Sequence, residues 1–165
     1  MTGPKDVLLQ QLETSDFLFK QLLNGLSDEE CFKPPVPGGN HAAWIVGHIA
    51  VSEDSMVADL TGKPKRIPEA THELFRGGST CYAGASKYPS RKQIDELYRD
   101  ARANTVESLR MFDVAKWSDP SPERYPRDLM GTAGAIWGLI STHAFWHIGQ
   151  LTVCRTAMGK KRVLG

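Results

Sequence analysis

Hydrophobic residues recur along most of the chain at steps of three, four and seven positions, which is the spacing of one face of an α-helix. Near the amino terminus this face comprises Leu8, Leu12, Phe19, Leu22 and Leu26. Pro4 precedes it and suits a first helical turn. The pattern therefore predicts a helix over residues 4–25.

A second long helix is expected over residues 40–60. Asn40 is a suitable N-cap, and Gly62 and Pro64 end the helical pattern. The following stretch, residues 61–89, is long for a connection within one domain, and such connections are commonly functional or cross over a bundle. A short helix is expected within it over residues 68–75. The segment is therefore interpreted as a long crossover between the second and third helices.

Two further long helices complete the pattern. Ser90 and Gln93 form a capping box that begins a helix reaching about residue 114. Thr132 caps a last helix over residues 133–158, which Gly159 closes. No run alternates at period two for long enough to predict a sheet. Four helices of roughly 20 to 25 residues predict an all-α four-helix bundle.

Composition narrows the class of protein. The 165 residues suit a single domain over residues 1–165. The 20 basic and 19 acidic residues almost cancel, so there is no electrostatic reason to expect nucleic acid or an anionic membrane as partner. No apolar run approaches the ~18 residues of a membrane span. The start of the chain does not resemble a signal peptide, and Cys31, Cys81 and Cys154 form no Cys-x-x-Cys pair, which favours a reducing cytoplasm.

The strongest chemical signal is a pair of histidines, His143 and His147, on the last predicted helix. Residues four apart on a helix lie about 40° apart around the axis and ~6 Å apart along it, so both imidazoles can reach one metal ion. Both also lie on the apolar stripe of this helix, where buried ring nitrogens need partners. On spacing alone, two core histidines bonded to neighbouring helices are an equal alternative. The zincin mechanism is excluded because Ala144 stands where its catalytic Glu belongs.

The second predicted helix offers a third ligand, His48, beside Gly47, whose missing side chain allows another element to approach closely. His41 lies on nearly the same face and is a candidate for the mouth of a binding pocket, or else a surface residue of the first turn. His72, in the crossover, is expected to be exposed to solvent.

Three polar residues near these histidines are secondary candidates. Gln150 is placed to hydrogen-bond a ligating ring or a neighbouring backbone group. Glu53 and Asp54 follow His48 by about one and a half turns and are candidate proton acceptors, Glu53 being the preferred catalytic candidate beside Gln150. The expected position of both carboxylates is a solvated helix face, and the role of proton acceptor applies only if the helix turns one of them inward.

Two motifs together resemble the DinB/YfiT-like metalloenzyme superfamily. They are Trp44-x-x-Gly47-His48-Ile49 and His143-x-x-x-His147-x-Gly149-Gln150-Leu151, and the similarity covers essentially the whole chain. The resemblance implies an up-down-down-up bundle, frequent homodimers, and one divalent metal bound by His48, His143 and His147. Imidazole suits zinc, nickel, cobalt and iron alike, so the metal stays open.

Three histidines with one open coordination position are typical of a catalytic zinc site. The resemblance implies a transferase or isomerase that uses a low-molecular-weight thiol and acts on a small-molecule substrate. The same site type can activate water, so a metal-dependent hydrolase is an alternative. A second alternative is a non-catalytic, stress-associated dimer in which the metal links two helices.

Overall fold

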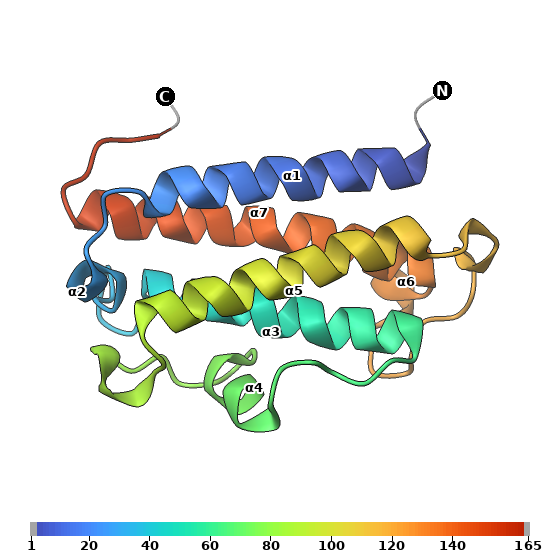
Figure 1. Cartoon of the computed structure of the whole chain (residues 1–165), viewed down its shortest axis with the longest axis horizontal. Coiled ribbons are helices and arrows are strands. Elements are labelled where there is room, and N and C mark those ends of the chain that lie inside the picture. The colour runs from blue at the N-terminus through green and yellow to red at the C-terminus, as the bar shows by residue number, and fades with distance from the viewer. Residues whose placement is uncertain (1–2, 164–165) are drawn as a thin grey trace.

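Four long helices lie side by side in the computed structural model, which describes residues 3–163 (Figure 1). They are α1 (Pro4–Leu23), α3 (Ala42–Thr61), α5 (Arg91–Met111) and α7 (Ala133–Ala157). Helices α1 and α7 run in one direction, and α3 and α5 run in the other (Figure 1). The predicted all-α, up-down-down-up four-helix bundle is therefore confirmed.

Five short helical segments occupy the connections between the long helices. They are α2 (Asp28–Cys31), α4 (Glu69–Phe75), η1 (Ala85–Lys87), η2 (Val114–Lys116) and α6 (Arg127–Met130). Within residues 3–163 there is no β-strand, only one isolated bridge between Pro120 and Thr132. The crossover between α3 and α5 carries α4 and packs it against α3. The long connection predicted between these helices thus forms an outer layer on the bundle.

Helix α3 is the most enclosed of the four long helices. It packs against α5, α7 and α4, and fourteen of its 20 residues are buried. The buried polar side chains of such a helix cannot reach solvent, so each of them needs a partner inside the protein. This requirement applies to His48, Glu53 and Asp54, which are all buried.

The N-caps follow the sequence signals with one exception, whereas α5 ends at Met111 and not near residue 114. Ser27, Ser90 and Thr132 accept hydrogen bonds from backbone N–H groups in the first turns of α2, α5 and α7. The N-cap of α3 is His41 and not Asn40, because the His41 Nδ1 atom accepts the backbone N–H of Trp44 at 2.9 Å. The prediction of Asn40 was wrong by one residue because an imidazole nitrogen can serve the same capping role as an amide oxygen.

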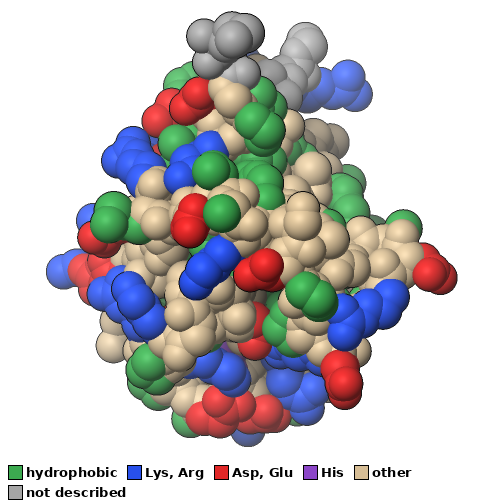
Figure 2. Space-filling model, turned by 90° about the vertical axis from the view of Figure 1, so that its right-hand side faces the viewer, with side chains coloured by type: hydrophobic (Ala, Val, Ile, Leu, Met, Phe, Trp, Pro, Cys, Tyr) green, Lys and Arg blue, Asp and Glu red, His purple; other side chains and the backbone are tan. Residues whose placement is uncertain are grey.

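The surface carries both signs of charge. Figure 2 views one end of the bundle and shows basic and acidic side chains intermixed there, with no histidine on this face. No helix in the described residues is both long enough and apolar enough to span a membrane.

Candidate metal centre

Three histidines meet where the antiparallel helices α3 and α7 pack against each other. His48 comes from α3, and His143 and His147 come from successive turns of α7. The His143 Nε2 atom lies 3.3 Å from Nε2 of His48 and 3.1 Å from Nε2 of His147. The three ligand atoms all lie within 4.8 Å of one another. The structure therefore brings together all three residues that the sequence singles out as metal ligands.

In two of the rings, the hydrogen bond made by Nδ1, the nitrogen that points away from the cluster, fixes the position of the proton. The His48 Nδ1–H group donates to the backbone oxygen of Phe75 at 2.7 Å, and the His147 Nδ1–H group donates to Oε1 of Gln150 at 2.9 Å. A neutral imidazole carries only one proton, so both Nε2 atoms present lone pairs to the centre of the cluster. This arrangement fixes the tautomer that metal ligation requires.

The donor set fits one small divalent cation. Two nitrogens bound at ~2.1 Å in a tetrahedral site lie about 3.4 Å apart, close to the two measured separations. No carboxylate in the described residues completes this cluster, so the set is three neutral nitrogens. The buried Nδ1 atom of His143 has no hydrogen-bond partner among the residues described. The lone pairs of His48 and His147 that face the centre of the cluster are costly to bury unless a cation or a proton donor lies between them.

The electrostatics keep these rings neutral. Burial, followed by repulsion from the His147 and His48 rings, lowers the pKa of His143 to about 3. Burial also lowers the pKa of His48 and of His147, although hydrogen bonds to Phe75 and Gln150 partly oppose this. All three rings are thus neutral at neutral pH, which is the charge state that ligation requires.

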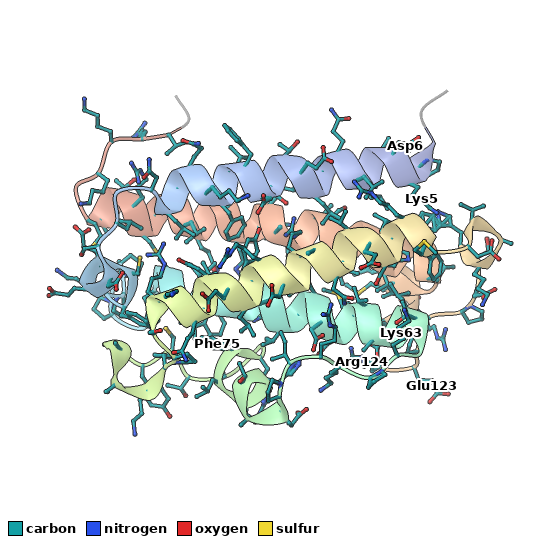
Figure 3. The ribbon with its side chains drawn as sticks, in the orientation of Figure 1. Lys5, Asp6, Lys63, Phe75, Glu123 and Arg124 are labelled. Carbon is teal, nitrogen blue, oxygen red and sulfur yellow. The ribbon has the colours of Figure 1, made fainter. Side chains whose placement is uncertain are left out.

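Two aromatic residues hold His48 in place. The Trp44 ring stacks on His48 with centroids 4.8 Å apart and an interplanar angle of 6°. Phe75 lies at the end of α4, beneath α3 (Figure 3). A Cβ atom on Gly47 would come within 2.5 Å of the Phe75 ring, so only glycine allows the close approach that brings the Phe75 carbonyl to His48. The close approach predicted from Gly47 is confirmed.

A pocket of about 350 Å³ adjoins the histidine cluster at His143. Its walls come from α3, α4, the connection before α6, and α7. A larger groove of about 780 Å³ lies along α1 and α5, but no histidine lines it. The smaller pocket is therefore the space from which a small molecule can reach the cluster.

Gln150 and Glu53, the two catalytic candidates, have different positions. Gln150 accepts the hydrogen bond from His147 and so supports a candidate ligand, which is one of the two roles considered for it. The Glu53 carboxylate is buried and forms an ion pair with Arg102 of α5, with Nη2 and Oε1 2.5 Å apart. The expectation of a solvated Glu53 was wrong, and its charge is directed to α5 and not to the histidine cluster.

Asp54 and His72, both also expected at the surface, form a buried pair. The His72 Nε2–H group donates to Oδ2 of Asp54 at 3.0 Å, and the exposed fractions of the two side chains are 5% and 3%. The expectations for both residues were wrong because the crossover folds back over α3. Their separation of 18 residues gives no sequence signal, whereas the four-residue spacing of Trp44 and His48 could have predicted their stacking.

His41 is fully buried, so both predictions for it, at the mouth of the pocket and at the surface, were wrong. Besides capping α3, its Nε2–H group donates to the backbone oxygen of Tyr82 at 3.1 Å. With both ring nitrogens bonded, His41 joins the start of α3 to the crossover. Cys154 of α7 is also buried, and its thiol donates to the backbone oxygen of Asn40.

Comparison with models of known protein families shows to which family the chain belongs. A family model of the DinB superfamily matches residues 11–151, which include all three histidines. The chain belongs to the DinB superfamily. No curated protein sequence matches it significantly.

Two solved structures share the fold of this DinB superfamily member. YfiT from Bacillus subtilis, described as a probable metal-dependent hydrolase with an unusual four-helix bundle topology, is 22% identical, with a TM-score of 0.67 over 95% of this chain and 89% of that chain. A conserved protein from Enterococcus faecalis is 15% identical, with a TM-score of 0.74 over 93% of this chain and 96% of that chain. At these identities the two structures establish the bundle fold and no more.

Proposed function

We propose that this protein is a metal-dependent enzyme in which His48, His143 and His147 hold one divalent cation. The observation that carries the proposal is the convergence of the Nε2 atoms of the three histidines. In two of the rings, His48 and His147, the proton lies on Nδ1 and is donated to a partner outside the cluster. A cation with three histidine ligands keeps a coordination position at which it lowers the pKa of water or a thiol and so supplies a nucleophile. Zinc, nickel, cobalt and iron all suit the donor set.

The first candidate reaction is transfer or isomerisation that depends on a low-molecular-weight thiol, which the family resemblance implies. The pocket beside His143 has room for a small-molecule substrate. Its lining includes Arg76, which pairs with Glu73, and Arg124, which pairs with Asp59, so the wall of the pocket is polar. A homodimer and a cytoplasmic location belong to the same proposal.

The second candidate reaction is hydrolysis. It is favoured by YfiT, which shares the fold and is described as a probable metal-dependent hydrolase. Both reactions would use the same three ligands and the same pocket, and they differ only in whether a thiol or a water acts as the nucleophile.

The test begins with metal content. The protein is stripped with chelator, reloaded separately with zinc, nickel, cobalt or ferrous iron, and analysed for bound metal by mass spectrometry. We expect one ion per chain. Failure of every metal to bind the refolded wild-type chain would contradict the proposal.

Each loaded form is then assayed with a chlorinated aromatic electrophile and several thiols, and with p-nitrophenyl acetate without thiol. Turnover that requires both metal and thiol supports the transferase, and metal-dependent release of nitrophenol without thiol supports the hydrolase. Stoichiometric metal with higher thermal stability but no turnover in any assay would favour a non-catalytic metal-binding dimer instead.

A further inference from the structure

The pocket beside His143 has a second histidine in its wall. His72 of α4 and Ser55 of α3 line it, together with the candidate ligand His143. The arginine side chains at this pocket are about half exposed, and Arg124 lies in the connection near the end of α3 (Figure 3). His72 is therefore the polar side chain of the pocket that is both buried and able to accept a proton.

Asp54 holds the far side of the His72 ring. One carboxylate oxygen accepts the backbone N–H of Arg66 at 3.0 Å. The other accepts the backbone N–H of Ile67 at 3.1 Å and the Nε2–H group of His72 at 3.0 Å. A carboxylate bound by two backbone groups of the crossover cannot rotate freely, so it fixes the orientation of the His72 ring.

The near side of the ring is almost without a partner. In the neutral form of the ring, the bond to Asp54 places the proton on Nε2, so the Nδ1 atom then carries a lone pair. Its only hydrogen-bond neighbour among the described residues is Oγ of Ser55 at 3.5 Å, which is the outer limit of such a bond. His41 shows the contrast, since it is equally buried and has both nitrogens bonded at 2.9 and 3.1 Å.

We propose that Nδ1 of His72 is the general base of this pocket and that Asp54 is its positioning residue. The inference rests on the proposed function and deepens it. A proton leaves the O–H or S–H group of a molecule held in the pocket and is bound at Nδ1. The resulting imidazolium keeps its Nε2–H bond to the Asp54 carboxylate, which stabilises the positive charge, and the proton is then delivered to the leaving group.

A purely structural role would use only the other side of the ring. The bond from Nε2 to Asp54 is sufficient to tie α4 to α3, and it makes no demand on Nδ1. The two roles therefore differ in one measurable property, which is whether Nδ1 of His72 is available to a small electrophile in the pocket.

The first experiment measures that property in the wild-type chain. Zinc-loaded protein is treated with diethyl pyrocarbonate, which acylates unprotonated imidazole nitrogens, and each histidine is quantified by peptide mass spectrometry. We expect His72 to react at least tenfold faster than His41, the matched buried control. Equally slow acylation of His72 and His41 in the folded protein would overturn the inference. The result does not depend on the folding of any variant.

The second experiment asks whether the nitrogen is used. In whichever assay the wild-type chain shows turnover, we expect His72→Gln to lower kcat by about 100- to 10,000-fold, with zinc content and KM near those of wild type. Asp54→Asn should lower kcat less and should slow the acylation of His72. Thermal melts establish that each variant is folded.

The two experiments separate this inference from the proposed function. A kcat within twofold of wild type in folded His72→Gln would overturn the general base while leaving the metal-dependent enzyme intact. Absence of turnover in every assay would contradict the proposal that the protein is an enzyme. The role of His72 as general base would then be overturned as well, and fast acylation of His72 would show only that its nitrogen is accessible in the pocket.

Discussion

Helix α3 carries two buried polar clusters that differ in how completely their hydrogen bonds are satisfied. On the side facing α7, His48 meets two other imidazoles, and one nitrogen of the cluster has no partner among the described residues. On the side facing α5, Glu53 meets Arg102, whose guanidinium also donates to Ser15 Oγ and to the backbone oxygen of Leu12 at 2.8 Å.

The comparison separates a structural cluster from a functional one. Opposite charges with filled hydrogen bonds stabilise each other and need nothing further. The lone pairs of His48 and His147 converge beside His143 and are satisfied only when a cation or a proton lies between the rings. Burial alone does not distinguish the two, since Glu53 and His48 are both buried; the state of the hydrogen bonds does.

The largest effect is expected from breaking the satisfied cluster. Glu53→Ala leaves the Arg102 charge buried and unpaired, which should lower the free energy of unfolding by about 3–5 kcal/mol. Urea denaturation measures the change. The control is the double variant Glu53→Leu with Arg102→Met, which should recover most of the loss. A single variant within 1 kcal/mol of wild type would contradict the structural role of the pair.

Removal of one ligand from the histidine cluster should affect metal more than folding. His143→Ala is expected to lower metal affinity by more than about 100-fold. This exceeds the loss of about 10- to 100-fold that is typical when a residue that only hydrogen-bonds to a metal ligand is replaced. In metal-free protein the same change should cost less stability than Glu53→Ala. Metal analysis after dialysis tests the first point, with the exposed neighbour Thr142→Ala as control. Stoichiometric metal in His143→Ala would exclude this ligand set.

Acid should weaken the metal-free histidine cluster selectively. Burial and neighbouring rings hold the folded-state pKa of His143 at about 3, below its ordinary value of 6.5. The unfolded chain therefore binds this proton first, and stability is lost as pH falls from about 6.5 towards 3. Chemical denaturation at several pH values should give a shallower decline for His143→Ala. Parallel curves for the two proteins would show that the ring is not protected from protonation.

The smallest effect is expected from Gln150, which supports His147 without joining the cluster. Gln150→Ala removes the acceptor of the Nδ1–H group and should lower metal affinity by about 10- to 100-fold. Gln150→Glu keeps an acceptor oxygen and should retain most of the affinity. Competition with a chromophoric chelator measures both. Equal affinities in wild type and Gln150→Ala would limit Gln150 to a surface role.

The local sequence determined the helices and two of the three histidines of the candidate site. Periodicity and caps predicted four long helices close to those observed, because these signals act between residues three or four positions apart. The same spacing placed His143 and His147 on one face of α7. The family motifs then identified His48 as their companion across the bundle.

Only the tertiary structure decided which polar residues are buried and what they contact. Glu53 and Asp54 follow each other on α3, yet one contacts Arg102 of α5 and the other contacts His72 of the crossover. These partners lie 49 and 18 residues away, beyond the reach of any local pattern. The physical reason is that α3 is enclosed by α4, α5 and α7, so packing and not periodicity selects the partner of each polar group.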